Sequence, residues 1–173
     1  MLFSTLAFAV LAPITALALP ASEGHSDASL VARKPGENLC SLKAPPKLCV
    51  PNKNITVAET AQRAYDFYRA FVVDGDAEKM FSLIDDVYVQ HNPGYKSGPL
   101  AIWPLFCSGR KIGSEASTSW CFDEKTGMSW AKYSTVDRWA WVDGCVHEHW
   151  DQREAFPSAD KCYKLPAAAT PAA

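Results

Sequence analysis

The sequence predicts an α+β domain in which helices pack on one face of a mainly antiparallel sheet. Helical periodicity comes first, in residues 56–84, and strand-like runs that end in turn signals dominate residues 86–151. Helices followed by strands are typical of a helical layer that covers one face of a sheet. A curved sheet folded over a long helix would leave a cavity between the two layers.

A long helix is predicted to begin after Thr56 and to end at Gly75. Thr56 and Glu59 have the spacing of a capping box, and Gly75 is typical of a helix C-terminus. Apolar residues recur between them at helical spacing. Asp76 can cap a second, shorter helix. We expect that helix to point three side chains inward: Met80, Phe81 and Ile84.

The next segment alternates as a strand over residues 86–91 and ends in a turn signal at residues 92–94. Residues 98–107 are predicted to form a short helix that is kinked or broken at Pro104, because proline lacks a backbone N–H. Two further strands are predicted after it: residues 117–123 and 128–142.

The last predicted strand runs into a β-hairpin whose turn signal is Asp143-Gly144. A two-residue loop would place Arg138 opposite His149, whereas a three-residue loop with a bulge would place it opposite Glu148. Opposite charges stabilise a cross-strand pair by up to about 1 kcal/mol, so we expect the bulged loop. In that register one face of the hairpin carries Asp137, Trp139, Trp141, Cys145, His147, His149 and Asp151.

The chain divides into four predicted segments: residues 1–19 as a signal peptide, 20–54 as an extended or disordered N-terminal segment, 55–160 as the domain, and 161–173 as a C-terminal tail. The leader is an apolar run followed by the cleavage signal Ala16-Leu17-Ala18. We therefore expect a secreted, extracellular protein with no membrane attachment after signal removal. The net charge is −2 without a basic block, which argues against a nucleic-acid partner.

An even number of cysteines in a secreted domain predicts disulfides, and six cysteines allow 15 pairings. We expect Cys107 and Cys121 to form one pair. No Cys-x-x-Cys occurs in the sequence, so a zinc ribbon or thioredoxin-type site is not expected. Asn54 begins an Asn-Ile-Thr acceptor sequence and predicts a glycoprotein. The cysteines are Cys40, Cys49, Cys107, Cys121, Cys145 and Cys162.

Four blocks of the sequence, spread over about residues 57–157, resemble SnoaL-like proteins of the nuclear transport factor 2-like superfamily. They are Tyr68 to Asp76, Tyr88-Val-Gln-His-Asn-Pro93, Val136-Asp137-Arg138, and Asp143-Gly-Cys-Val-His-Glu-His-Trp-Asp151. The resemblance implies a cone-shaped NTF2-like fold with helices packed on a curved, mainly antiparallel sheet that encloses a pocket. Relatives include polyketide cyclases, dehydratases, isomerases and epoxide hydrolases, together with members without known activity. Fold is therefore a poor guide to the reaction.

By resemblance, the acid/base carboxylate of the cyclases and epoxide hydrolases falls near Asp151. A carboxylate in an apolar cavity holds its proton more tightly, and an imidazole beside it can orient it. We expect His149 and Asp137 to tune Asp151, and His91 to polarise a substrate oxygen. The residues expected to contact the ligand are Trp139, Trp141, Trp103, Tyr65, Tyr68 and Asn92.

Structural roles are the competing interpretation of these residues. The hairpin groups can simply hydrogen-bond to one another, and Tyr65 and Tyr68 can pack the helix onto the sheet. Three departures from the family pattern leave the substrate open: Cys145 at a usually basic position, the polar Gln152-Arg153-Glu154, and a shortened region between Phe106 and Met128.

A metal site is a second interpretation, because alternate strand residues such as His147, His149 and Asp151 point the same way, and His91 could complete the set. The resembled family mostly works without metals, so we expect no cofactor and no metal.

Two functions stay open: a cofactor-free cyclase, isomerase or dehydratase acting on a hydrophobic small molecule, and a non-catalytic secreted ligand-binding or interaction protein. A closed cavity with Asp137 and Asp151 at its floor would favour the enzyme. Many members of the fold dimerise through the outer sheet face, so a homodimer is compatible with an outward Trp150.

Overall fold

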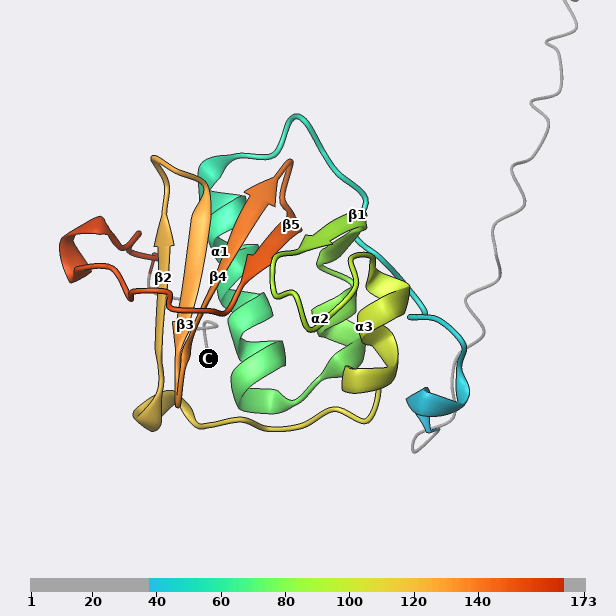
Figure 1. The fold of residues 1–173 in the computed structure, drawn as a ribbon. Helices are drawn as coiled ribbons and strands as arrows, with labels where there is room; N and C mark the ends of the chain where they lie inside the picture. The colour runs from blue at the N-terminus through green and yellow to red at the C-terminus, as the bar shows by residue number, and fades with distance from the viewer. Residues whose placement is uncertain (1–37, 167–173) are drawn as a thin grey trace, which may run out of the picture. The chain divides into compact units, whose positions relative to one another are not determined.

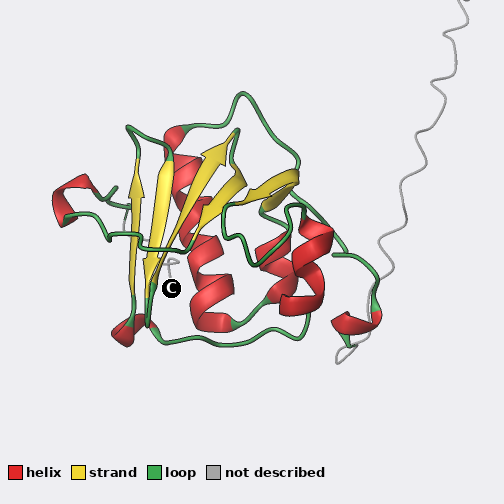
Figure 2. Ribbon diagram, viewed as in Figure 1, coloured by secondary structure: helices red, strands yellow, loops and turns green. Residues whose placement is uncertain are grey.

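The computed structural model describes residues 38–166, so the predicted signal peptide and residues 167–173 lie outside the described part of the chain. The described residues form an α+β fold, as predicted (Figures 1 and 2). Its helices are α1 (Val57–Tyr68), α2 (Ala77–Phe81) and α3 (Pro99–Phe106). Its strands are β1 (Ile84–Gln90), β2 (Ser119–Asp123), β3 (Met128–Lys132), β4 (Val136–Val142) and β5 (Cys145–Trp150).

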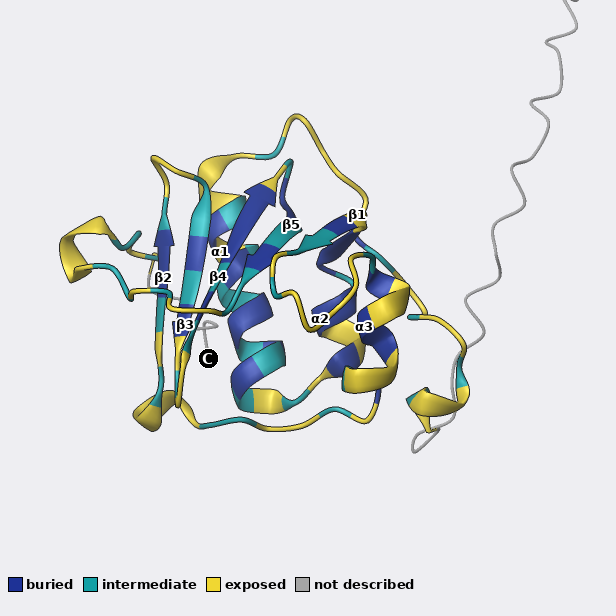
Figure 3. Cartoon of the chain, in the orientation of Figure 1, coloured by how far each residue is buried: buried dark blue, intermediate teal, exposed yellow. Residues whose placement is uncertain are grey.

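The strands form one mixed sheet in the order β1-β5-β4-β3-β2. β1 and β5 are parallel, and the other neighbours are antiparallel. The buried residues of α1 face those of β4 across the core (Figure 3). Phe67 of α1 contacts both Trp139 and Trp141 of β4, with ring centroids 5.2 and 6.0 Å apart. The sheet is therefore covered by helices on the face that carries these tryptophans.

α1 begins with the predicted capping box, since the Thr56 hydroxyl accepts from the Glu59 N–H and the Glu59 carboxylate accepts from the Thr56 N–H. The helix continues into a π-helical turn, η2 (Arg69–Asp74), and ends at Gly75 with φ 65°. A Cβ at Gly75 would lie 2.8 Å from the backbone of Arg110. Glycine is thus required there by both conformation and space.

α2 is shorter than predicted. It ends at Phe81, and Ile84 begins β1, where it pairs with Val146 instead of belonging to a helix. Ile84 is still buried, because the sheet supplies the apolar surroundings that the helix was expected to supply. α3 is not broken at Pro104, since the Cys107 N–H donates to the Trp103 carbonyl oxygen at 2.9 Å and extends the helix past the proline.

The segment predicted as one strand over residues 128–142 is two strands, β3 and β4. The chain reverses at Tyr133, whose N–H donates to the Thr135 carbonyl oxygen at 2.9 Å. After the reversal β4 pairs with β3 on one side and with β5 on the other, so its backbone N–H and C=O groups are hydrogen-bonded on both sides.

The predicted register of the β4–β5 hairpin is wrong. The loop has two residues, Asp143 and Gly144, with φ 49° and 79°, as a type I′ turn requires. A shift further along, between Ala140 and Trp141 of β4, leaves His147 as the extra residue of β5. Arg138 consequently lies opposite Trp150, and its guanidinium lies 4.3 Å from the centre of that indole.

This bulge decides which side chains of β5 face the core. Val146 pairs with Trp141 and is fully buried, and His149 pairs with Trp139. His149 therefore shares the face of Trp139, as predicted. Cys145 and His147 do not share that face, because the extra residue reverses the alternation between them and His149.

All six cysteines are paired, as Cys40–Cys107, Cys49–Cys145 and Cys121–Cys162. Disulfides are confirmed, but the expected Cys107–Cys121 pair is wrong. The bridges instead attach the two ends of the described chain to the domain: residues 40 and 49 to α3 and β5, and residue 162 to β2. Three disulfides are consistent with a secreted or extracellular protein. Within residues 38–166, no helix has the length and apolar character needed to cross a membrane.

The described part of the N-terminal segment is held in place by more than its disulfides. The Cys49 N–H donates to the Ile84 carbonyl oxygen at 2.8 Å, and the Asn52 N–H donates to that of Asp143 at 2.9 Å. The Trp103 indole N–H donates to the Leu42 carbonyl oxygen at 2.9 Å. Asn54 is exposed, as a glycosylated asparagine must be.

Candidate functional site

A cavity of about 290 Å³ lies between the helices and the sheet. Most of its wall is apolar or aromatic: Phe67, Phe71, Met80, Ile84, Ile102, Leu105, Phe106, Ile112 and Trp139. Polar side chains line the rest: Tyr88, Gln90, Asn92, Tyr95, Tyr133, Thr135, Asp137, His149 and Asp151. An apolar cavity with a few convergent polar groups is the usual form of a small-molecule site.

Asp137 of β4 is the most buried acid of the cavity, with an exposed fraction of 2%. Its Oδ2 accepts a hydrogen bond from the Tyr133 hydroxyl at 2.7 Å and lies 3.4 Å from His149 Nε2. The imidazole of His149 is stacked on the Trp139 indole, with centroids 5.1 Å apart and planes at 8°. Packing and hydrogen bonding therefore hold the carboxylate and the imidazole against each other.

Gln90 determines which nitrogen of His149 carries the proton. The Asn92 backbone N–H can only donate, and it donates to Gln90 Oε1 at 3.0 Å. The amide nitrogen of Gln90 therefore faces His149 Nδ1, at 2.9 Å, and donates to it. Nδ1 must accept, so the proton of the neutral imidazole lies on Nε2, the nitrogen that faces Asp137.

Asp151 directly follows β5 and is the second carboxylate of the cavity. Its Oδ2 accepts from the Asn92 side-chain amide at 2.9 Å. The Asn92 Oδ1 accepts in turn from the Gly94 N–H and from the Gln152 amide, at 2.8 and 3.2 Å. The turn after β1 thus orients the carboxylate that follows β5.

Three polar atoms of this cluster are buried without a hydrogen-bonding partner: Asp137 Oδ1, Asp151 Oδ1 and His149 Nε2. A buried polar atom without a partner costs free energy, so such atoms are rare in folded proteins unless a ligand or water completes them. Each carboxylate of the cavity uses one oxygen to hold its position and leaves the other oxygen unused.

Two tyrosines of the cavity are held in the neutral form. Burial raises the pKa of Tyr88, and the negative charges of Asp151 and Asp137 raise it further. Burial also raises the pKa of Tyr133, with contributions from the charge of Asp137, the hydrogen bond to it, and the charge of Asp151. The Tyr88 oxygen accepts from the Gln90 amide at 3.2 Å, and no described residue accepts its proton. Tyr88 can therefore donate to a ligand.

The remaining predicted site residues lie away from the cavity. The His91 ring stacks on Trp150 with centroids 4.3 Å apart, and its Nε2 lies 2.7 Å from Glu148 Oε2. Trp103 and Trp141 are buried in the core, and the Trp141 indole N–H donates to the Ser129 hydroxyl at 2.8 Å. The hydroxyls of the two α1 tyrosines contact the segment before β2: Tyr65 contacts Glu115, and Tyr68 contacts Thr118.

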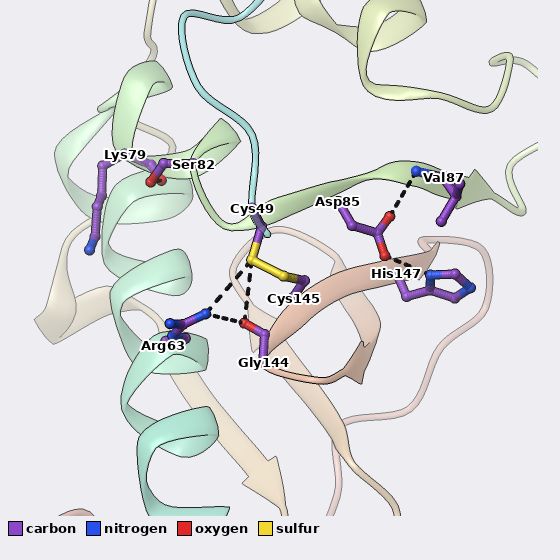
Figure 4. The surroundings of a disulfide bond; sticks show 9 residues. All are labelled: Cys49, Arg63, Lys79, Ser82, Asp85, Val87, Gly144, Cys145 and His147. Carbon is purple, nitrogen blue, oxygen red and sulfur yellow. Dashed lines mark hydrogen bonds and ion pairs between the residues drawn. A yellow bond between two sulfur atoms is a disulfide. The ribbon is translucent and has the colours of Figure 1, made fainter. Parts of the chain in front are cut away.

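His147 lies outside the cavity because of the bulge at its position. Its Nδ1 lies 2.7 Å from the buried Asp85 Oδ2, near the Cys49–Cys145 disulfide (Figure 4). It therefore does not join His149 and Asp151 in the arrangement proposed for a metal. Among residues 38–166, no group of three or more His, Cys, Asp or Glu side chains is placed to hold a metal ion.

Sequence reasoning assigned no role to Tyr88, Gln90 or Tyr133, although each contacts a group of the cavity. The sequence did contain a signal for Tyr88 and Gln90. Alternation along the strand puts Tyr88 and Gln90 on one face and His91 on the other, so the choice of His91 excluded its neighbours. Tyr133 gave no such signal, since its position depends on the chain reversal between β3 and β4.

Comparisons with known proteins identify no relative: the chain matches no protein-family model, and no curated protein or solved structure matches it significantly. The function must therefore be argued from the cavity itself.

Proposed function

We propose that this protein is a secreted, SnoaL-like, NTF2-like domain that binds a hydrophobic small molecule in the cavity and catalyses cofactor-free proton transfer on it, as an isomerase, dehydratase or cyclase does. The observation that carries the proposal is the pair of carboxylates, Asp137 and Asp151, each with a buried, unpartnered oxygen in a mainly apolar cavity. Such oxygens are suited to receive a proton from a ligand.

The fold supports the family part of this proposal. The resemblance implies helices packed on a mainly antiparallel sheet with a pocket between them. Three features agree with that expectation. The sheet has one parallel pair, a helix lies across its inner face, and both layers line a cavity.

In the proposed reaction, Asp151 removes a proton from a carbon next to a carbonyl group. Asn92 holds one oxygen of Asp151, which leaves Oδ1 to act as the base. The free proton of the Tyr88 hydroxyl hydrogen-bonds to the substrate oxygen as negative charge develops there. The protonated Asp151 then returns its proton to another position of the substrate, so no external acid or oxidant is required.

Asp137 and His149 have a positioning role in this scheme. Tyr133 holds Asp137, and the Nε2 proton of His149 faces the same carboxylate. Asp137 therefore keeps a fixed negative charge beside the reacting group, and neither Asp137 nor His149 gives or takes a proton in the reaction.

A general probe tests the proposal without knowledge of the natural substrate. 5-Nitrobenzisoxazole loses its C3 proton to a base, its N–O bond breaks, and a coloured cyanophenolate is released. We expect the wild-type protein to accelerate this reaction and Asp151→Asn to lower the acceleration by about 10²-fold. His147→Gln is the matched control, since His147 lies on the same strand outside the cavity.

Equal rates for wild type and Asp151→Asn would overturn the catalytic part of the proposal. In that case a co-purified small molecule, detected by non-denaturing mass spectrometry of the wild-type protein and lost in Trp139→Ala, would favour the alternative of a non-catalytic ligand-binding protein.

A further inference from the structure

The cavity has an unbalanced negative charge. Two carboxylates line it, and no lysine or arginine does so within residues 38–166. The groups that contact these carboxylates are neutral: a tyrosine hydroxyl on Asp137 and a side-chain amide on Asp151. His149 contributes no positive charge either, because Gln90 donates to its Nδ1 and so holds the ring in a neutral tautomer.

The arginine that is nearest in sequence points elsewhere. Arg138 follows Asp137 on β4, and successive strand residues point to opposite faces. Its guanidinium lies over Trp150 and forms a 2.9 Å ion pair with Glu154. It therefore cannot neutralise Asp137 across the sheet.

The same two carboxylates also act on the tyrosines of the cavity. Burial raises the pKa values of Tyr88 and Tyr133, and the charges of Asp137 and Asp151 raise them further. The carboxylate charges that oppose a negative phenolate also favour a positive group, whereas burial opposes a charge of either sign. The buried, unpartnered Oδ1 of Asp137 is an acceptor for such a group.

We infer that the ligand of this cavity is a cation, namely an apolar, ring-containing amine that binds in its protonated form. This inference rests on the proposed function, since it names the substrate class of the same cavity. The ammonium N–H groups donate to the free oxygen of Asp137, which leaves Oδ1 of Asp151 available as the base, and the ammonium supplies the positive charge that the cavity lacks. The rings of Phe67, Phe71 and Trp139 surround the apolar body and can stabilise the charge by cation–π contact.

The volume limits the size of this amine. A cavity of about 290 Å³ lies at the lower end of the range for small-molecule sites, roughly 300–1,000 Å³. A fused bicyclic ring with a short amine arm is the size that such a cavity admits.

Three probes with one ring system separate charge from shape: 1-naphthylmethylamine as the cation, 1-naphthalenemethanol as the neutral probe, and 1-naphthoate as the anion. Titration calorimetry at neutral pH measures their affinities for the full-length protein. We expect the cation to bind at least about tenfold more tightly than the neutral probe, equal to about 1.4 kcal/mol, and the anion to bind more weakly than both.

Substitutions test whether the two carboxylates cause the preference for the cation. Asp151→Asn and Asp137→Asn keep the shape of the side chain and remove its charge, so each should weaken the cation by about tenfold and leave the neutral probe nearly unchanged. Asp86→Asn is the matched control, because Asp86 is an exposed acid of β1 and its loss changes the net charge equally. Should Asp137→Asn fail to fold, the less buried Asp151 carries the test.

Each outcome decides between the proposals. Equal binding of the cation and the neutral probe overturns the amine inference and leaves the cavity as a site for neutral ligands. Tighter binding of the anion also overturns it. Binding of none of the three probes, together with no acceleration of 5-nitrobenzisoxazole cleavage, overturns both this inference and the proposed function.

Discussion

The side-chain amide of Gln90 lies 2.9 Å from Nδ1 of His149, and the Asn92 backbone N–H fixes the direction of that amide. A residue at the end of one strand thus sets the protonation of a residue on the neighbouring parallel strand. The proton on His149 faces Asp137 as a result. The position of the His149 proton and the neutral state of the ring both depend on this one contact.

Gln90→Glu should reverse the His149 tautomer. A carboxylate at residue 90 accepts from Nδ1–H, whereas the amide donates to Nδ1. Nitrogen-15 NMR of the imidazole rings measures this directly. We expect the wild-type His149 to carry its proton on Nε2 and the variant to carry one on Nδ1. His147 provides an internal reference, because its Nδ1 faces the Asp85 carboxylate in both proteins. An unchanged His149 spectrum would contradict the assignment.

The free energy of unfolding should fall at alkaline pH, because Tyr88 loses its proton more readily in the unfolded chain than in the folded protein. Its pKa is raised above the ordinary value of 10.0 in the folded state, so above that pH the unfolded chain has lost a proton that the folded protein retains. Stability therefore falls as the pH rises beyond about 10, by up to about 1.4 kcal/mol per pH unit for one group.

Tyr88→Phe removes this group, so its stability should fall less steeply than that of the wild type when urea unfolding is measured between about pH 9 and pH 11.5. Identical slopes for the two proteins would show that Tyr88 ionises at its ordinary pH in the folded state.

The Cys49–Cys145 disulfide should be a main contributor to stability. It joins residues separated by 96 positions, and closing a loop of this length restricts the unfolded chain by roughly 4–5 kcal/mol. Arg63 lies beside the bridge and donates to the Gly144 carbonyl oxygen at 3.1 Å (Figure 4). The variant Cys49→Ala/Cys145→Ala should lose several kcal/mol in urea unfolding.

The bridge with the shorter separation of 41, Cys121–Cys162, is the comparison. Its removal should cost somewhat less, since the entropy of closure grows slowly with loop length. A loss below about 1 kcal/mol in the Cys49/Cys145 variant would mean that the Cys40–Cys107 disulfide and the hydrogen bonds of the N-terminal segment hold it without this bridge.

Gly144→Ala should destabilise the hairpin by roughly 1–3 kcal/mol. Gly144 has φ 79°, and an added Cβ would collide with Ile55 Cδ1 and lie 3.2 Å from Arg63 Nη1. Gly127→Ala is the matched control, because Gly127 also has positive φ, 66°, but an added Cβ there would meet only the Trp141 carbonyl oxygen, at an ordinary contact distance of 3.5 Å. Thermal unfolding should therefore rank Gly127→Ala above Gly144→Ala in stability. The reverse order would contradict the steric argument.

Local signals in the sequence were sufficient for the α+β class, the capping box at Thr56 and the helix end at Gly75. They also placed Asp137, Trp139 and His149 on one face of the hairpin. Each of these features depends on residues a few positions apart, so a short window contains its cause. The even cysteine count predicted disulfides for the same reason, since it requires no knowledge of which residues meet.

The tertiary structure alone decided the register, the disulfide pairing and the polar network of the cavity. The extra residue at His147 removed it from the face of His149, and Arg138 met Trp150 instead of Glu148. Gln90 reaches His149 from β1, and Tyr133 reaches Asp137 from the turn between β3 and β4. Such contacts join residues distant in the chain, and their free energies depend on packing that no local pattern encodes.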